Sequence, residues 1–410
     1  MDLKPQPGLP VPARPGAPFE KAKSLPGAVF AWVRDNLFNT WYNTVLTGIS
    51  LWVSYQLGVG FARWALHTAQ WEVVTVNLRL LLIGRFPGDQ LWRLWLLLGV
   101  IALWSGLSWG VWGQAGRWVA VATVAGLATA LVLPVTLAVR LGLAVQIGLV
   151  VSGLFLGRRW RQPWHLGLLI GGWLLTPVVG LLLLKGWPGL TLLPAVETSA
   201  WGGLLLTIIL AVVGIVASFP LGILLALGRR STLPVIRGFS IAFVELVRGV
   251  PLVTVLFMAQ VMLPLFLPGD LRPDKVLRAM AGMVLFSAAY VAENVRGGLQ
   301  AVPRGQIEAA QALGLNSVLT TLLIVLPQAL RAVIPAIVGQ LISLFKDTSL
   351  VAIVGLIELL GMAQSILAQP RFLGRYAEVY VFVAVVYFVF SYAMSYASRR
   401  LELALGVGER

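Results

Sequence analysis

Two charged residues lie side by side in an otherwise apolar run, where an ionisable side chain is costly and marks a functional candidate. They are Lys346 and Asp347, and Asp347 shares one helical face with Gln340 and Ser343. One cation and one anion suit the carboxylate and the ammonium of a zwitterionic substrate, and the amide and hydroxyl add uncharged hydrogen bonds. The alternative is structural: residues 346–349 satisfy backbone groups where the helix is interrupted.

A second stripe of polar side chains recurs at helical spacing, namely Ser287, Tyr290, Asn294 and Gly297. Glu293 lies beside this stripe, and Arg296 follows it three residues later. Two interpretations are open: a structural Glu293–Arg296 pair near the inner membrane boundary, or side chains that line a substrate path. Glu245 and Arg248, also three residues apart, predict a structural ion pair.

Other kinds of chemistry are excluded by residue types that the chain lacks. It has no cysteine and two histidines, so disulfides, thiol catalysis and cysteine-based zinc sites are excluded. His67 and His165 are isolated, and each is interpreted as a solvated or structurally paired imidazole. The chain contains no G-x-x-x-x-G-K-[ST] segment, so it has no loop that could cradle a nucleoside triphosphate.

The composition is that of a membrane protein. Hydrophobic residues make up 58% of the 410 residues and charged residues 11%, against about 45–50% and about 25% in soluble domains. This excludes a soluble globular enzyme. The net charge of +15 would suggest nucleic acid as the partner of a soluble protein, but basic cytoplasmic loops facing anionic lipid explain it without one.

Ten apolar runs have the length of about 20 residues that a membrane-spanning helix needs: 39–62, 91–112, 118–138, 141–157, 166–184, 200–227, 240–267, 277–298, 322–345 and 379–398. We therefore expect an all-α integral membrane protein with about ten transmembrane helices. The stretch 118–157 is either two short spans turning at Arg140 or one tilted helix kinked at Pro134, and eight spans is the alternative count.

Arginines at the ends of these runs indicate the orientation. If the chain has ten spans, most of these arginines lie on the same side of the membrane as the amino-terminal tail. They are Arg158, Arg159, Arg161, Arg229, Arg230, Arg237, Arg304, Arg399 and Arg400. The positive-inside rule favours this arrangement, with that side cytoplasmic. Arg79 and Arg85, which would fall in an outside loop, argue against it.

Tryptophan divides the chain into unequal parts. Fifteen of the sixteen tryptophans precede residue 190, and the last is Trp201. We predict three parts: residues 1–30 as a disordered cytoplasmic tail, 31–195 as a Trp-rich transmembrane extension, and 196–410 as a second membrane region. Residues 186–198, with two prolines, are expected to form an outside loop that joins the last two.

Between the eighth and ninth runs lies a polar, alanine-rich segment, 305–316, which predicts a short helix outside the bilayer. Glu308 is expected in its first turn, where a carboxylate suits the helix dipole. Ala309, Ala310, Ala312 and Leu313 provide a face of small side chains, and Gly314 is expected to end the helix in the αL conformation. Such a helix either enters a groove on another protein or rests on lipid headgroups.

The same segment resembles the cytoplasmic EAA signature of ABC importer permeases. Glu308-Ala309-Ala310 is followed by three residues, Gly314, nine residues and Ile324-Val325-Leu326-Pro327. The resemblance extends from about residue 199 to 405 and narrows to the polar amino-acid uptake family; the runs that carry it are 203–207, 219–231, 245–252, 289–298 and 344–350. By length and hydropathy, the extension resembles that of the larger permease of general L-amino-acid importers.

This resemblance implies a five-helix permease core with its amino end outside and its carboxyl end inside, in agreement with the charge argument. It implies a multi-pass protein of the bacterial inner membrane and a partner permease, expected to be a different, related chain. It also implies two ATPase subunits docked on the EAA helices and an external substrate-binding protein. ATP and Mg would be bound by the ATPases, so this chain would be a transport subunit without a catalytic site or cofactor of its own.

The sequence therefore predicts two sets of site residues. The ATPase-coupling set is Glu308, Ala309, Ala310, Ala312, Leu313 and Gly314, and the substrate-path set is Lys346, Asp347, Gln340, Ser343, Glu293, Asn294 and Tyr290. The rival interpretation is an amino-acid carrier driven by an ion gradient, in which Glu293, Lys346 and Asp347 relay protons. The third interpretation is a purely structural membrane scaffold.

Overall fold

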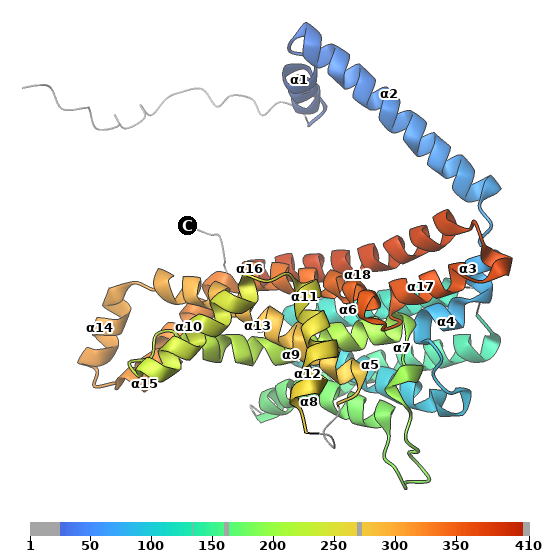
Figure 1. Cartoon of the computed structure of the whole chain (residues 1–410). Helices are drawn as coiled ribbons and strands as arrows, with labels where there is room; N and C mark the ends of the chain where they lie inside the picture. Colours follow the sequence, from blue (N-terminus) through green and yellow to red (C-terminus); the bar gives the residue numbers. More distant parts are fainter. Residues whose placement is uncertain (1–24, 134, 160–163, 269–272, 405–410) are drawn as a thin grey trace, which may run out of the picture. The chain divides into compact units, whose positions relative to one another are not determined.

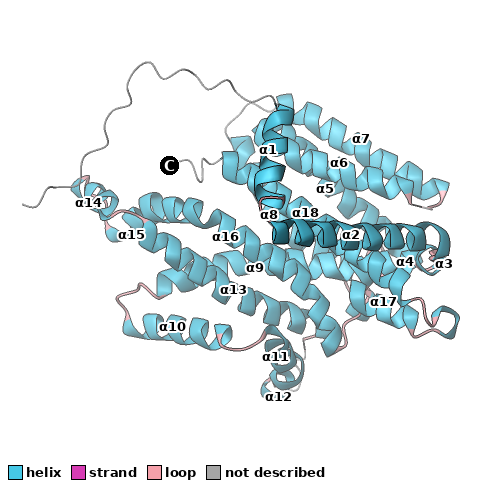
Figure 2. Cartoon of the chain, turned by 90° about the horizontal axis from the view of Figure 1, so that it is seen from above, coloured by secondary structure: helices cyan, strands magenta, loops and turns pink. Residues whose placement is uncertain are grey.

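The computed structural model describes residues 25–133, 135–159, 164–268 and 273–404 (Figure 1). Within these ranges every regular element is helical (Figure 2), and the one β-type contact is an isolated bridge between Gly203 and Glu358. The chain divides into two compact units, residues 1–69 and 70–410. The expected all-α membrane fold is thus confirmed.

The first unit contains α1 (Leu25–Leu37), α2 (Trp41–Arg63) and a π-helical turn, Trp64–Thr68. Thr40 caps α2 by accepting a hydrogen bond from the backbone N–H of Asn43. No residue of α2 is buried, as expected of a helix that faces lipid. The predicted disordered tail, 1–30, is wrong for its last six residues, because α1 begins at Leu25; residues 1–24 lie outside the described part.

The extension continues with short helices α3 (Glu72–Val76) and α4 (Leu78–Ile83) and long helices α5 (Leu91–Trp112), α6 (Gln114–Val132), α7 (Leu137–Arg159) and α8 (Trp164–Lys185). Helix α5 packs against α6, α7 and α8. It approaches α7 closely: a Cβ on Gly106 would lie 2.0 Å from the carbonyl oxygen of Val150. Small residues at a crossing let two helix backbones approach in this way.

The stretch 118–157 contains two separate helices, α6 and α7, which pack against each other. Helix α6 ends at Val132 and α7 begins at Leu137, so the two helices do not turn at Arg140, which is inside α7. Pro134, the predicted kink, lies outside the described residues. The apolar part of α6, Gly116–Val132, is shorter than a full span.

The second half is built on α9 (Gly203–Gly228) and α13 (Lys275–Ala301), which pack along each other. Helix α16 (Leu326–Asp347) packs against α13, and α18 (Tyr376–Ala404) packs against α16. Between α13 and α16 lie α14 (Arg304–Ala312), α15 (Ser317–Leu319) and a π-helical turn, Thr320–Val325. After α16 come a 3₁₀ segment, Thr348–Val354, and α17 (Leu359–Leu367).

The seventh predicted span, 240–267, is not one helix. It is split into α10 (Pro234–Arg248), α11 (Leu252–Phe257), a π-helical turn (Met258–Met262) and α12 (Leu263–Phe266). The two parts are bent by 109° at residues 249–251. Pro251 supplies no N–H and disfavours the helical conformation of the residue before it, which explains the break.

By length and hydropathy the described residues contain eight helices that could span a membrane, or nine if the bent pair counts as one span. With the shorter α6, each of the ten predicted runs has a helical counterpart. The extension and the second half share one buried apolar cluster, in which Phe86, Leu184 and Val196 join Trp201 and Leu206. The predicted boundary near residue 195 is compositional and stays a prediction.

Candidate functional site

The predicted coupling segment forms helix α14, which begins after Pro303. It ends in a Schellman motif: the N–H of Leu315 donates to the carbonyl of Ala310 at 3.2 Å, and that of Gly314 donates to the carbonyl of Gln311 at 2.9 Å. Gly314 has φ +81°, the left-handed conformation expected of it. Because the helix begins at Arg304, Glu308 lies beyond the first turn, and that part of the prediction is wrong.

The two faces of α14 differ in burial. Ala310 is buried at 3% exposure, and Ile307 packs against the apolar cluster that includes Val325 and Ala329. The other predicted coupling residues face outward: Glu308, Ala309, Ala312, Leu313 and Gly314. Leu313 is 83% exposed. One face therefore anchors the helix to the second half of the chain, and the opposite face is free.

Beside α14 lies a cavity of about 500 Å³, lined by residues of α9, the loop after it, α14, α15 and the π-helical turn Thr320–Val325. Arg230 and Thr232, after α9, form one wall, and Ile307 and Gln311 of α14 form another. Asn316 caps the next helix by accepting a hydrogen bond from the N–H of Leu319 at 2.9 Å. The ends of α9 and α14 thus border one cavity.

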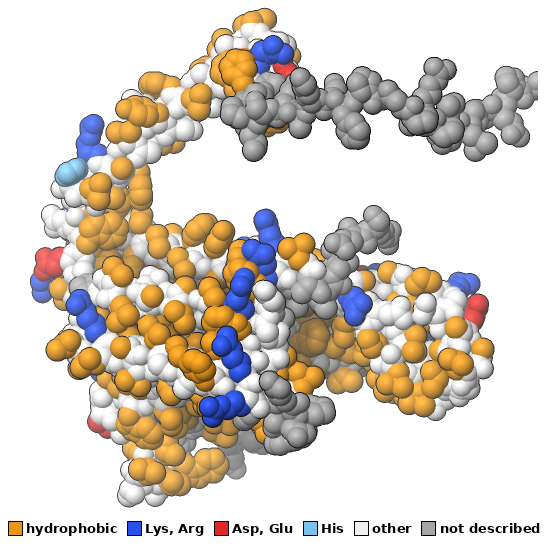
Figure 3. All heavy atoms as spheres, turned by 180° about the vertical axis from the view of Figure 1, so that it is seen from behind, with side chains coloured by type: hydrophobic (Ala, Val, Ile, Leu, Met, Phe, Trp, Pro, Cys, Tyr) orange, Lys and Arg blue, Asp and Glu red, His pale blue; other side chains and the backbone are white. Residues whose placement is uncertain are grey.

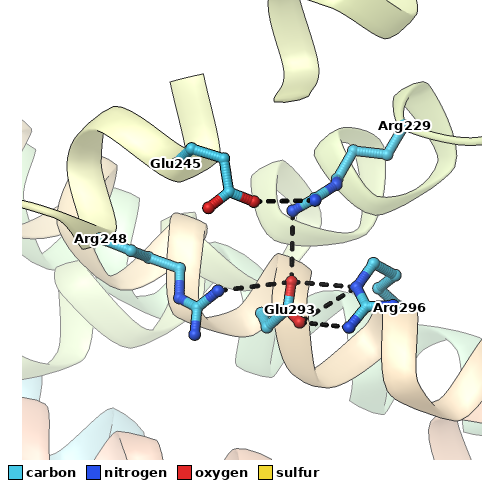
Figure 4. A network of polar contacts seen from close by, with 5 residues as sticks. All are labelled: Arg229, Glu245, Arg248, Glu293 and Arg296. Carbon is cyan, nitrogen blue, oxygen red and sulfur yellow. Dashed lines mark hydrogen bonds and ion pairs between the residues drawn. The ribbon is translucent and has the colours of Figure 1, made fainter. Parts of the chain in front are cut away.

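Glu293 is the centre of an ion-pair network that joins α9, α10 and α13 (Figure 4). Its carboxylate lies 3.2 Å from a guanidinium nitrogen of Arg229 and 3.5 Å from one of Arg248. It also accepts bonds of 3.0 Å from Nε of Arg296. The structure therefore contains the predicted Glu293–Arg296 pair within a larger cluster.

The predicted Glu245–Arg248 pair is wrong. Glu245 binds Arg229 at 2.9 Å, and Arg248 points to Glu293 instead (Figure 4). Both residues lie on the last turn of α10. The oppositely charged partners beside that turn are Arg229, directly after α9, and Glu293 within α13. Longer-range partners have replaced the local one.

The rest of the α13 stripe is only partly engaged. The ring of Tyr290 lies 5.5 Å from the Arg248 guanidinium and packs on Phe286. The hydroxyl of Ser287 is buried and has no hydrogen-bond partner among the described residues. Asn294 is half-buried, and Gly297 is exposed.

The Lys346 and Asp347 side chains form no ion pair within the described residues. The side chain of Lys346 is exposed. Asp347, Gln340 and Ser343, on the same helix, are half-buried. No hydrogen bond or ion pair links these residues to the Glu293 network in the part of the chain that the structure describes. The two predicted polar groups are therefore separate.

The helix does break after Asp347, where α16 passes into the 3₁₀ segment. Hydroxyl groups bond to the backbone there: Thr348 donates to the carbonyl of Phe345 at 2.6 Å, and Ser349 to that of Lys346 at 2.8 Å. Of residues 346–349, the two hydroxyl residues bond to backbone groups where the helix is interrupted. The charged side chains of Lys346 and Asp347 form no ion pair among the described residues.

Sequence reasoning missed a buried carboxylate, Glu358, which caps α17. It accepts hydrogen bonds of 2.9 Å from the N–H groups of Leu360 and Gly361, and 3.1 Å from the hydroxyl of Tyr387. Thr207 of α9 lies 3.4 Å from the same carboxylate. Burial raises the pKa of Glu358, and the hydrogen bonds oppose that shift. A lone acid within the apolar run 350–360 was the available signal.

A second missed residue, Arg93, is fully buried in α5. It donates to the carbonyl of Leu183 at 3.2 Å, of Leu184 at 3.3 Å and of Pro194 at 2.7 Å. The guanidinium thus caps the end of α8 and holds the loop that follows. A single arginine inside an otherwise apolar run, 91–112, was the signal.

That loop forms part of a cavity of about 810 Å³ between the extension and the second half. Arg85 and Lys185 come from the extension, and Lys275 and Arg278 from the start of α13. Glu197 and Asp274 also line this cavity. Helix α13 has 27 residues, so the cavity and α14 are separated by roughly 40 Å of helix.

Metal ligands do not gather in the described residues, where no group of three or more His, Cys, Asp or Glu side chains lies close enough to hold an ion. His67 is exposed in the turn after α2, and the side chain of His165 lies outside the described part.

Comparison with known proteins identifies the family. Residues 218–404 match the model described as "Binding-protein-dependent transport system inner membrane component". The chain is 41% identical over 394 residues to the inner membrane amino-acid ABC transporter permease protein YhdY of Escherichia coli, covering 92% of this chain and 93% of the relative.

Two further relatives differ in the share of this chain that they match. The glutamate/glutamine/aspartate/asparagine transport system permease protein BztC of Rhodobacter capsulatus is 37% identical, covering 95% of this chain and 96% of the relative. The probable glutamine ABC transporter permease protein GlnP of Bacillus subtilis is 36% identical, covering 50% of this chain and 92% of the relative. With this spread of relatives and its polytopic helical fold, the chain belongs to the amino-acid ABC transporter permeases of the inner membrane.

Proposed function

We propose that this chain is the transmembrane subunit of an ATP-driven amino-acid importer in the cytoplasmic membrane of a bacterium. Substrate arrives from an external binding protein and passes between this chain and a second, related permease. Two separate ATPase subunits drive alternate access by gripping residues 305–316. The observation that carries the proposal is α14, which is anchored through Ala310 and Ile307. Its opposite face is exposed at Glu308, Ala309, Ala312, Leu313 and Gly314.

The exposed face of α14 suits a groove on an ATPase. Ala309 and Ala312 permit close approach because their side chains are small, and the exposed Leu313 is an apolar anchor at the end of the helix. The Schellman motif at Gly314 holds that end rigid, as a lever requires. ATP and Mg would be bound by the partners, since this chain has no phosphate-binding loop.

Single-cysteine cross-linking tests the docking directly, because the chain has no cysteine of its own. Ala309→Cys in the assembled complex should cross-link to an ATPase subunit with a short thiol–amine reagent. Leu190→Cys, exposed in the loop after α8, is the control and should not. Absence of any ATPase adduct from Ala309→Cys, in a complex that hydrolyses ATP, would reject the assignment.

For the substrate path we propose Lys346 and Asp347, with Gln340 and Ser343, as the residues that receive the ammonium and carboxylate. Both charges lack an ion-pair partner in the described residues, which leaves them available to a ligand. Tyr290, Asn294 and Glu293 are proposed to line the neighbouring part of the path.

The substrate class follows from the relatives, whose names give amino acids, among them glutamate, glutamine, aspartate and asparagine. Asp347→Asn should lower uptake with the ATPases still assembled, whereas Ser349→Ala, which removes only a hydroxyl bonded to the backbone, should not. Equal uptake by Asp347→Asn and the unmodified chain would remove Asp347 from the path.

The rival function, a carrier driven by a proton gradient, has less support. Its relay would need Glu293 to exchange protons with Lys346 and Asp347, but Glu293 is held by three guanidiniums. No described hydrogen bond leads from it to α16. The rival predicts uptake by the purified chain alone, in vesicles with a proton gradient and no ATP. We expect none.

A further inference from the structure

Two guanidiniums share one indole where α6 meets the end of α18. The Cζ of Arg117 lies 4.7 Å from the centroid of the Trp118 ring, and that of Arg400 lies 4.5 Å from it. Tyr396 packs edge-on against the same indole, and its hydroxyl accepts a hydrogen bond of 3.1 Å from Arg400. Because both cation–π distances end at the centroid of one ring, the two like charges lie at most about 9 Å apart.

No ion pair in the described residues neutralises these charges. Neither Arg117 nor Arg400 forms an ion pair there, and the nearby Glu402 accepts its hydrogen bond from Ser398. Arg117 also lies in the first turn of α6, which has no side-chain cap. A cation is disfavoured at the positive end of a helix, so the local field is strongly positive and attracts an anion.

The pair lies at the ends of apolar helices, where headgroups are found. Arg400 is the last residue of the span Tyr376–Arg400, and the apolar part of α6 begins at Gly116. Trp and Tyr beside Arg are typical of the membrane–water interface. In Figure 3, a row of Lys and Arg side chains borders a largely apolar face, with few acidic ones near it.

An aromatic track leads from the pair along the surface of α18. Tyr392 and Phe388 precede Tyr396 by one and two helical turns, are 62% and 66% exposed, and stack on each other at 5.9 Å. Such a track offers an apolar surface to an acyl chain directly beside the two guanidiniums. A free phosphate ion would gain nothing from it.

We propose that Arg117 and Arg400 bind the phosphate of one anionic phospholipid, with an acyl chain of that lipid on Tyr392 and Phe388. Guanidinium groups suit phosphate because their fork of N–H donors matches its oxygens. The lipid would bridge α6 of the extension and α18, the last helix of the permease core. The assignment of this lipid to the cytoplasmic leaflet rests on the membrane orientation in the proposed function. The lipid site itself does not rest on that orientation.

The experiment uses the purified full chain in neutral detergent and follows lipid binding by native mass spectrometry and the melting temperature by tryptophan fluorescence. The probes are phosphatidylglycerol, phosphatidylcholine with the same acyl chains, and inorganic phosphate. We expect phosphatidylglycerol alone to bind and to raise the melting temperature. Arg117→Gln/Arg400→Gln should weaken that binding by about tenfold or more, as expected for losing two charge-assisted contacts.

The matched control is Arg158→Gln/Arg159→Gln, which removes two arginines from the last turn of α7 that share no aromatic ring with each other among the described residues. It should leave binding within about twofold, which is the scatter expected for surface charges. Arg117→Lys/Arg400→Lys keeps the charge but not the fork, and should bind with intermediate affinity. If the Arg117→Gln/Arg400→Gln variant fails to fold, lipid binding by the Arg117→Lys/Arg400→Lys variant is compared with binding by the unmodified chain instead.

Three results would overturn the proposal. One is an equal loss of binding in the control pair, which would indicate diffuse attraction; another is equal binding of phosphatidylcholine. The third is an equal effect of inorganic phosphate, which would indicate a free-anion site. Transport is not measured, so failure here leaves the proposed function untouched.

Discussion

Arg93 reaches across the extension to Pro194: its Nη2 donates a 2.7 Å hydrogen bond to the Pro194 carbonyl, 101 residues further along the chain. The same guanidinium also bonds to the carbonyls of Leu183 and Leu184. One buried cation therefore holds the end of α8 and the loop that lines the cavity of about 810 Å³.

Replacing Arg93 should destabilise this part of the chain. Arg93→Met keeps much of the volume but leaves three backbone carbonyls without their donor, at a cost on the order of 3 kcal/mol. The melting temperature of the purified chain measures it. Arg79→Met, which loses one bond to the carbonyl of Phe86 from an exposed position, should cost under about 1 kcal/mol. Equal melting temperatures for the two variants would show that Arg93 is not the anchor.

Gly314→Trp should uncouple ATP hydrolysis from transport without unfolding the chain. A Cβ at Gly314 would meet no atom within 4 Å, so the fold has room for the side chain, and the cost is the strained φ of +81°, about 1 kcal/mol. The indole would obstruct the proposed docking face. Uptake and substrate-stimulated ATPase activity are measured in the reconstituted complex.

Gly314→Asn is the control, because asparagine tolerates the left-handed conformation and is small. It should retain most of the transport activity. Unchanged transport and stimulation in Gly314→Trp would mean that α14 is not gripped by the ATPases.

Glu293→Gln should lower stability more than Glu245→Gln does. Glu293 is the shared anion of Arg229, Arg248 and Arg296 and is 24% exposed, whereas Glu245 is 58% exposed and binds Arg229 alone. Loss of the central carboxylate leaves adjacent guanidiniums to repel one another, at a cost on the order of 2 kcal/mol. The exposed pair should contribute under about 1 kcal/mol. Thermal unfolding of both variants decides the order, and a reversed order would contradict the network.

Glu358 should make the stability of the chain depend on pH. Its folded-state pKa is raised by burial, so between the unfolded and folded pKa values the folded state binds more protons. Stability from this group is then fully present below the unfolded pKa and is lost as pH rises through the folded pKa.

The difference in melting temperature between the unmodified chain and Glu358→Gln, followed across pH, isolates this group from the other carboxylates. The unmodified chain should lose stability relative to the variant as pH rises. A difference that does not change with pH would mean that the surrounding hydrogen bonds fully offset burial.

Hydropathy located the helices because a span must bury about 20 residues in hydrocarbon whatever it packs against. The sequence likewise predicted the helix in the alanine-rich segment and its end at Gly314. Both are local properties, because a glycine in the left-handed conformation commonly ends a helix. Hydropathy alone does not locate the break at 249–251, because the apolar run 240–267 continues through Pro251.

Which side chains meet was decided only by the tertiary fold. Glu245 finds Arg229 rather than Arg248, and Glu358 is buried among Thr207 and Tyr387, because packing sets the rotation of each helix about its axis. The sequence pattern gives the spacing of residues along one helix, but it does not show which residues of another helix they will contact. The sequence by itself thus determined the spans, the family signature and the exposed segment, while the ion-pair partners and the paired arginines on Trp118 depended on long-range contacts.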